Sequence, residues 1–417
     1  MSRRLAVLVL VVLAAGSVLA GVLAASDDDD GGGRVPEAGG GSEPLEHTSF
    51  LARIVPPAPE RPAEASAGVP RSTAELVRRL PLERKVAQLM LVGFRGRDFN
   101  APVFRRLRRL DYGGIVVDAL NYSGPQLLGG LAGEAVVISQ QEHHVPPFVM
   151  ATQEGGTYNA FPDLPPARAP SELGTAEDAA AEAGQAGTTL RALGVTGLFG
   201  PVVDVAAETD LVIGPRAFSD DPDLVAGFAA ATVAAYREAE LFAAVKHFPG
   251  LGTASQSTEE GPAQVGLTTE QLAARDLVPF RAAFEAGVPG VVLSHALYAV
   301  DDFTVPGSLS KRVATDLLRQ ELHFRGVAIT DDLADPAVTA FAPAPEAAVR
   351  ALRAGADLLF ISGPPGDQQA AYVALLRAVR SDDDLRARVD QAVGRILLAK
   401  QRYGLIQRER PRRRRTP

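Results

Sequence analysis

Residues 245–252 read Val-Lys-His-Phe-Pro-Gly-Leu-Gly, and the rest of the chain is interpreted around this stretch. The apolar residues 241–245 that lead into it predict a buried strand. The proline and the two glycines then interrupt the strand and favour a loop. Lys246 and His247 therefore lie where a buried strand meets a glycine-rich loop. Such a junction is typical of binding sites in α/β enzymes, although a Lys-His pair that only ends a strand would have the same pattern.

Short apolar segments alternate with helical segments on both sides of this stretch. The expected strands are residues 86–93, 113–117, 147–151, 196–205, 241–245, 290–294, 326–330 and 356–361. The expected helices are residues 104–110, 125–141, 176–193, 224–239, 269–286, 309–322 (capped by Ser310), 344–354, 369–380 and 384–403. This alternation predicts an α/β fold, a single closed (β/α)8 barrel of the TIM type. No Gly-x-Gly-x-x-Gly motif follows the first strand, which argues against a dinucleotide-binding sheet.

The composition limits the partners and the chemistry that the chain can support. The chain of 417 residues is 46% apolar, enough for a large core, and its net charge of -8 argues against a nucleic-acid partner. It contains no cysteine, which excludes disulfides, thiolate nucleophiles and cysteine-bound zinc. Because no His-x-His or paired His/Glu motif is present either, we expect no metal and no cofactor.

The N-terminal sequence predicts export. Ser2-Arg3-Arg4 is basic and residues 5–25 are apolar or small, as in a signal peptide or a membrane anchor, and cleavage stays open. The basic side would remain in the cytoplasm, so the remainder would be extracytoplasmic, either secreted or anchored to the cytoplasmic membrane. We expect residues 1–25 to be this segment, 26–72 a disordered linker, 73–405 the barrel and 406–417 a basic tail.

Polar side chains are expected at the ends of five strands. They are Glu154, Asp204, Lys246 with His247, Ser294 with His295, and Asp331 with Asp332. Each alone fits a structural role, but in a barrel these strand ends share one face, which carries the active site. A carboxylate such as Asp331 serves there as a metal ligand, a nucleophile or a general acid/base. Without a metal motif, and beside Lys, Arg and His donors, it fits glycoside hydrolysis, which needs an anion below an oxocarbenium-like centre.

Four motifs occur in order along residues 73–405. They read Gln-Glu-Gly-Gly at 153–156, Ile-Gly-Pro-Arg-Ala-Phe at 213–218, Lys-His-Phe-Pro-Gly at 246–250 and Thr-Asp-Asp at 330–332. Together they resemble glycoside hydrolase family 3, and within it the bacterial β-N-acetylhexosaminidases. The resemblance implies a retaining mechanism with a covalent glycosyl-enzyme, in which Asp331 is the nucleophile. The expected substrate-binding residues are Lys246, His247, Arg216, Asp204, Glu154 and His295.

The sequence departs from this resemblance at the general acid/base. In the hexosaminidase branch, the loop after the fifth strand carries Asp-Ser-His, and its Asp-His pair transfers the proton. Here these positions are Ser257, Thr258 and Glu259. We predict that Glu259 takes the acid/base role, with Glu260 as the alternative. The family's sugar-binding Asp before Gln-Glu-Gly-Gly is Thr152 here, which weakens the case for N-acetylglucosamine.

The sequence thus predicts an exported glycosidase that cleaves O-glycosyl bonds with retention, similar to β-N-acetylhexosaminidases and acting on cell-wall glycans. The alternative is a family 3 barrel that has lost turnover and serves as a carbohydrate-binding or scaffold protein. The expected ligand is a carbohydrate, the expected state is a monomer, and membrane contact is expected only through residues 1–25. A redox or aldolase barrel is less favoured, because no cofactor motif supports it.

Overall fold

Eight parallel strands follow one another around a barrel in the order β7-β6-β5-β4-β3-β2-β1-β8. The computed structural model describes residues 70–406. The strands are β1 (Met90–Gly93), β2 (Gly114–Val116), β3 (Phe148–Ala151), β4 (Gly197–Val202), β5 (Phe242–Phe248), β6 (Gly290–Leu293), β7 (Val327–Thr330) and β8 (Leu359–Ile361). A parallel bridge between Ile329 and Leu358 joins β7 to the residues before β8 and closes the ring. The predicted (β/α)8 barrel is therefore confirmed.

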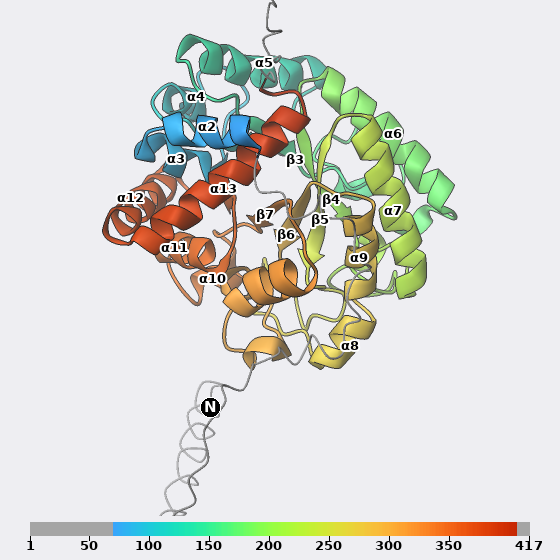
Figure 1. Cartoon of the computed structure of the whole chain (residues 1–417). Helices are drawn as coiled ribbons and strands as arrows, with labels where there is room; N and C mark the ends of the chain where they lie inside the picture. The colour runs from blue at the N-terminus through green and yellow to red at the C-terminus, as the bar shows by residue number, and fades with distance from the viewer. Residues whose placement is uncertain (1–69, 407–417) are drawn as a thin grey trace, which may run out of the picture. The chain divides into compact units, whose positions relative to one another are not determined.

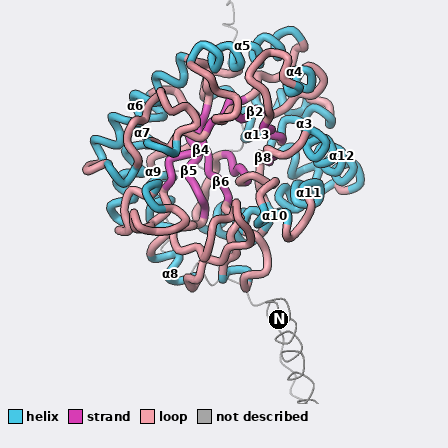
Figure 2. Tube along the Cα trace, turned by 180° about the vertical axis from the view of Figure 1, so that it is seen from behind, coloured by secondary structure: helices cyan, strands magenta, loops and turns pink. Residues whose placement is uncertain are grey.

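Helices surround the strands on the outside of the barrel (Figure 1). They are α2 (Arg71–Arg79), α3 (Leu82–Gln88), α4 (Pro102–Leu107), α5 (Pro125–Gln141), α6 (Ala176–Ala192), α7 (Pro222–Glu238), α8 (Thr269–Ala274), α9 (Leu277–Glu285), the π-helix η8 (Arg312–Glu321), α10 (Pro336–Thr339), α11 (Ala344–Ala354), α12 (Pro365–Ser381) and α13 (Asp383–Arg402). Figure 2 shows the loops that join them to the strands from the other side. Within residues 70–406, no helix combines the length and apolarity needed to cross a bilayer.

Several expected elements differ from the structure at their boundaries, and two of these differences have a clear physical reason. Residues 86–88 belong to α3, and the first strand begins only at Met90, because an apolar run alone does not distinguish a buried helix end from a strand. The expected helix 269–286 is two helices, α8 and α9. Pro279 explains the break, since in one continuous helix its ring would collide with the carbonyl of Arg275. The predicted cap of η8 is present, because Ser310 Oγ accepts a hydrogen bond of 3.0 Å from Val313 N.

A buried ion cluster closes the barrel at the amino ends of β7 and β8. The carboxylate of Asp357, which is 0% exposed, accepts hydrogen bonds from Arg319 (2.7 Å), Arg388 (2.7 Å) and Arg395 (3.0 Å). Burial alone would raise the pKa of Asp357, but the three arginines outweigh it and lower the pKa to about 2. The cluster therefore ties η8 and α13 to the strands.

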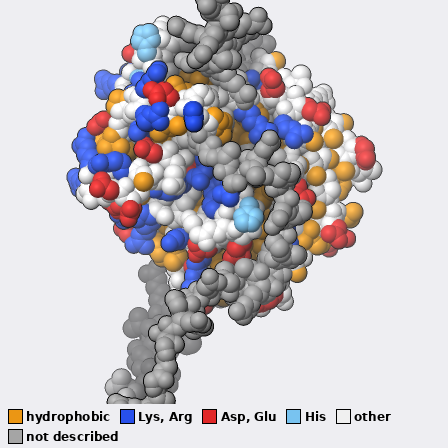
Figure 3. Space-filling view, viewed as in Figure 1, with side chains coloured by type: hydrophobic (Ala, Val, Ile, Leu, Met, Phe, Trp, Pro, Cys, Tyr) orange, Lys and Arg blue, Asp and Glu red, His pale blue; other side chains and the backbone are white. Residues whose placement is uncertain are grey.

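The predicted N-terminal segment, nearly all of the linker, and residues 407–417 of the tail lie outside the described residues. On the face shown in Figure 3, basic, acidic and apolar side chains are interspersed over the described part of the chain. This face, which carries α13, presents mixed charge (Figures 1 and 3).

Candidate active site

The carboxyl ends of β3 to β7 carry the site residues predicted from the strand pattern. Glu154 follows β3, Asp204 follows β4, Lys246 and His247 lie within β5, His295 follows β6, and Asp331 directly follows β7. Arg216 is in the 3-10 turn Gly214–Arg216 of the loop after β4. Because all eight strands run parallel, these positions share one end of the barrel, where β4, β5 and β6 lie side by side (Figure 2).

Glu154 holds two cations at this end of the barrel. Its Oε2 accepts a 2.6 Å bond from Arg216 Nε, and its Oε1 lies 2.5 Å from Lys246 Nζ. Burial favours the neutral carboxyl, but the charges of Lys246 and Arg216 outweigh it and hold the pKa of Glu154 well below its ordinary value. The guanidinium of Arg216 also lies 5.9 Å from the ring centre of Tyr158. Glu154 is therefore an anion that positions Lys246 and Arg216.

His247 lies between two carboxylates. Its Nδ1 is 2.7 Å from Asp204 Oδ2, and because a carboxylate accepts, Nδ1 carries the proton of this bond. Its Nε2 is 3.9 Å from Asp331 Oδ2. Asp204 is 0% exposed and also accepts a 2.7 Å bond from Leu251 N, in the loop after β5. Asp204 thus fixes the orientation of the His247 imidazole and the start of this loop.

A bulge in β5 explains how two successive residues reach the same site. Val245 pairs with Val291 of β6, but Phe248 pairs with Leu293, so β5 contains one extra residue between the two pairings. In a regular strand, Lys246 and His247 would point to opposite faces. The irregularity breaks this alternation, and the strand continues through the Lys-His pair rather than ending at residue 245.

The two acidic residues after β7 have different environments. Asp331 has a side chain that is 27% exposed, and although burial raises its pKa, the electrostatic influence of His247, His295 and Lys246 together brings the pKa below the ordinary value. Asp332 instead uses Oδ1 to accept bonds from Ala334 N (3.0 Å) and Ser362 N (2.9 Å). Burial raises the pKa of Asp332. Asp331 is therefore the anion that faces the site, and Asp332 anchors the loop.

His295 is a buried residue that contacts the backbone of this acidic pair. It is 0% exposed, its Nε2 donates to the backbone carbonyl of Asp332 at 2.9 Å, and its Nδ1 lies 2.7 Å from Ser308 Oγ. Burial lowers the pKa of His295, so the neutral ring accepts from the Ser308 hydroxyl. With both nitrogens engaged, His295 positions Asp331 and Asp332.

Glu259 and Glu260 lie exposed in the loop after β5. Glu259 N donates to Ser257 Oγ at 3.2 Å, and the carbonyl of buried Thr258 accepts a 3.1 Å bond from Ala337 N in α10. No hydrogen bond or ion pair joins Glu259 to Asp331 within residues 70–406. The hydrogen bond between Thr258 and Ala337 fastens the loop to the segment that follows Asp331.

Asp335 is an acidic residue of this region that the sequence analysis did not single out. It immediately precedes α10, four positions after Asp331, and the negative charges of Asp331, Asp332 and Glu259 act on it. The only sequence signal at this position is Asp-Pro, which is typical of a helix start.

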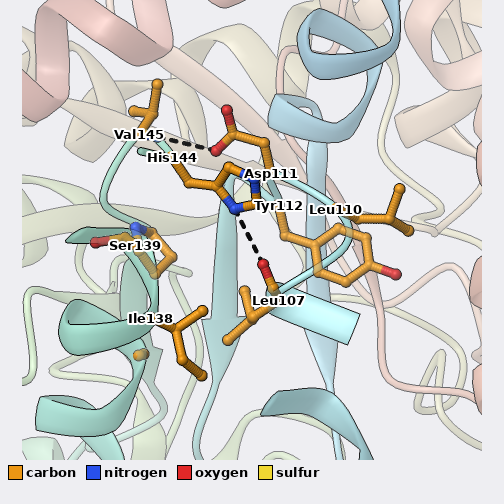
Figure 4. Close-up of a pocket in the computed structure, with 10 residues that line it drawn as sticks. Leu107, Leu110, Asp111, Tyr112, Ile138, Ser139, His144 and Val145 are labelled. Atoms are coloured by element: carbon orange, nitrogen blue, oxygen red, sulfur yellow. Dashed lines mark hydrogen bonds between the residues drawn. The ribbon is translucent and has the colours of Figure 1, made fainter. Parts of the chain in front are cut away.

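A small pocket lies at the opposite end of the barrel, between α4, α5 and the loops before β2 and β3 (Figure 4). Asp111 lines it and accepts bonds from Gln88 Nε2 (2.9 Å) and Val145 N (3.0 Å). His144 Nδ1 donates to the carbonyl of Leu107 at 3.0 Å. Because the surrounding protein already engages this acid and this imidazole, we assign the pocket a structural role.

Comparisons with known proteins agree with this geometry. The model of the glycosyl hydrolase family 3 N-terminal domain matches residues 81–399. A β-hexosaminidase of Stenotrophomonas maltophilia (strain K279a) is 30% identical over 303 residues, which cover 70% of this chain and 89% of that protein.

Two solved structures of glycoside hydrolase family 3 proteins are also similar to this chain. A glycoside hydrolase family 3 β-N-acetylglucosaminidase from Paenibacillus sp. has a TM-score of 0.74 and 34% identity, over 78% of this chain but only 63% of that chain. A glycosyl hydrolase of the same family from Mycobacterium smegmatis has a TM-score of 0.69 and 30% identity, over 78% of this chain and 98% of that chain.

Proposed function

The chain belongs to glycoside hydrolase family 3, and on this premise we propose that it is a retaining glycosidase whose nucleophile is Asp331. The observation that carries the proposal is the environment of this carboxylate: it is partly exposed, anionic and 3.9 Å from His247 Nε2. A retaining enzyme needs such an anion below the anomeric carbon.

In the proposed reaction, Asp331 attacks the anomeric carbon while the bond to the leaving oxygen breaks, and that oxygen receives a proton. Water then attacks the glycosyl-enzyme, loses its proton to the protein and releases Asp331. Lys246 and Arg216, both held by Glu154, would donate hydrogen bonds to sugar hydroxyls. Because these cations are already positioned, the sugar does not have to order them on binding.

In the hexosaminidase branch that the chain resembles, the group that transfers the proton lies in the loop after β5. Glu259, at the position of the family's histidine, is the sequence prediction for this role, and it stays a prediction. The hydrogen bond between Thr258 and Ala337 brings α10 against the same loop.

For the substrate, we propose a β-linked N-acetylhexosaminide of a cell-wall glycan. The names of the relatives support the sugar, since they are β-hexosaminidases and a β-N-acetylglucosaminidase. The cell-wall location depends on export, which residues 1–25 predict. A reporter enzyme fused after Ser72 tests export: it should be active only in a reporter system that requires translocation, and a reporter active only in the cytoplasm would contradict it.

The test of the activity is a screen of 4-nitrophenyl glycosides that differ only in the sugar, with intact-mass analysis for a trapped glycosyl adduct. We expect turnover with N-acetyl-β-glucosaminide, and an adduct that is absent in Asp331→Asn. Turnover without an adduct at Asp331 would reject the nucleophile.

A second candidate is a carbohydrate-binding barrel without turnover. The observation that favours it is the loss of the family's Asp-His pair, whose positions are Ser257 and the exposed Glu259. Absence of both turnover and adduct, together with saturable glycan binding by the parent protein, would establish this alternative.

A further inference from the structure

The sequence Asp-Pro begins two helices of the barrel, and the aspartate behaves differently in each. At α7, Asp221 Oδ1 caps the helix by accepting bonds from Asp223 N (2.9 Å) and Leu224 N (3.3 Å). At α10, Asp335 occupies the same position but its side chain makes no capping bond. Within residues 70–406, the carboxyl of Asp335 has no hydrogen-bond donor at all. It is thus available to an external partner.

The surroundings of Asp335 favour the neutral acid. Its charged neighbours are the carboxyls of Asp331 and Asp332, on its own segment, and of Glu259, on the loop that Thr258 fastens to α10. Burial raises the pKa of Asp335, and these three negative charges raise it further, to about 9. At neutral pH, Asp335 therefore holds a proton while Asp331, four positions earlier in the chain, is an anion.

We propose that Asp335 is the general acid/base of the glycosidase reaction, an inference that rests on the proposed function and on Asp331 as its nucleophile. A neutral carboxyl beside an anionic one is the arrangement that a retaining glycosidase uses. The family's proton donor lies in the loop after β5, whereas this donor lies in the segment after β7.

The charge on Asp331 changes between the two steps of the reaction, and this change lets Asp335 act first as an acid and then as a base. In the first step, an oxygen of Asp331 bonds to the anomeric carbon, the glycosidic bond breaks, and the proton of Asp335 moves to the leaving oxygen. Asp331 is then an ester and carries no charge, so one of the charges that raised the pKa of Asp335 is gone. Asp335, now a carboxylate, accepts a proton from water as the water oxygen bonds to the anomeric carbon and the ester bond breaks.

Glu259 acts on this proton through its charge. It is exposed, and its charge raises the pKa of Asp335. The sequence instead predicts that Glu259 transfers the proton itself. The two roles can be distinguished, because only loss of the proton donor makes activity depend on the leaving group of the substrate.

The experiment compares Asp335→Asn, Glu259→Gln and Asp221→Asn in the full chain. Asp221 provides a matched control, because it occupies the same Asp-Pro position, is exposed and caps its helix through its own carboxylate. Each variant is assayed on two glycosides of the sugar that the screen selects: the 2,4-dinitrophenyl glycoside, whose leaving group needs no proton, and the methyl glycoside, whose leaving group does.

We expect Asp335→Asn to lose about 10²- to 10⁴-fold in kcat/KM on the methyl glycoside. On the 2,4-dinitrophenyl glycoside its first step should persist, the glycosyl-enzyme should accumulate, and azide should restore turnover by forming a glycosyl azide of retained configuration. The surviving first step also shows that this variant folds. Glu259→Gln should show neither leaving-group dependence nor azide rescue, and the alkaline limb of its pH profile should move to lower pH. Asp221→Asn should match the parent.

The opposite pattern overturns the inference: leaving-group dependence and azide rescue in Glu259→Gln, with parental kinetics in Asp335→Asn. The proposed function would then survive, because the parent still forms its adduct at Asp331. If the parent shows neither turnover nor adduct on the 2,4-dinitrophenyl glycoside, the proposed function fails and this inference fails with it.

Discussion

The Nζ atom of Lys246 lies 2.5 Å from Oε1 of Glu154, and both side chains are almost completely shielded from solvent. The lysine comes from β5 and the glutamate from the loop after β3, so the contact spans the carboxyl end of β4, which lies between these two strands. In a buried ion pair of this kind, removing one partner would leave the other charge buried without compensation, which destabilises the fold. The site therefore depends on both partners.

Replacing Glu154 by Gln should destabilise the fold and weaken substrate binding. The change removes the anion between Lys246 and Arg216 and leaves two buried cations close to each other. Breaking a buried pair costs about 3–5 kcal/mol, which denaturant unfolding should detect. The control is Glu346→Gln, an exposed partner of Arg350, which should change the free energy of unfolding by less than about 0.5 kcal/mol. Equal stability of the two variants would contradict the role assigned to Glu154.

Replacing Asp331 by Asn should remove turnover while the fold remains. Loss of a nucleophile lowers kcat by about 10⁴-fold or more, and an amide of the same shape fits the same space. Asp332→Asn is the matched control, because its amide oxygen still accepts the bonds from Ala334 and Ser362. Steady-state kinetics and thermal unfolding of both variants check this. If Asp332→Asn is the inactive one, the nucleophile has been assigned to the wrong carboxylate.

Acid should destabilise the barrel through Asp357. The pKa of Asp357 is about 2 in the fold and 3.8 ordinarily, so its stabilising effect is complete above about pH 4. As the pH falls from about 4 to 2 the unfolded state takes up the proton first, and a contribution of about 2 kcal/mol is lost. In Asp357→Asn this part of the pH dependence should be absent, as urea unfolding at several pH values would show. An unchanged acid slope would argue against this cluster as its source.

Removing the carboxyl of Asp335 should stabilise the protein above neutral pH. Its pKa is about 9 in the fold and 3.8 ordinarily, so the folded state keeps a proton that the unfolded state has released. The parent therefore loses stability as the pH rises from about 4 to 9. The melting temperature of Asp335→Asn should exceed that of the parent at pH 8 and equal it near pH 4. A constant difference across this range would contradict the raised pKa.

The barrel was predictable from the sequence because its strands are short apolar runs between recognisable helices. The helix at residues 125–141 matches α5 at both ends. The prediction was wrong at residues 86–88, where an apolar run continues from α3 towards β1, and at Pro279, whose effect on a long helix was overlooked. Both errors concern the boundaries of elements, which local patterns define poorly.

The site was only partly predictable. Parallel strands place Glu154, Lys246 and Asp331 at one end of the barrel, but the sequence does not reveal which of these residues pair. The bulge that aims both Lys246 and His247 at the site has no clear local signal. Asp335 was missed because Asp-Pro ordinarily indicates a helix cap, and only the structure shows that its carboxyl makes no capping bond.

The ion cluster around Asp357 has a consequence for how the protein is made. Arg319 precedes this aspartate in the chain, but Arg388 and Arg395 belong to α13 and are synthesised afterwards. Until α13 has been synthesised, Asp357 has one of its three arginines, and burying it then would leave the anion undercompensated. The ring of strands is therefore expected to close only after α13 has emerged from the ribosome.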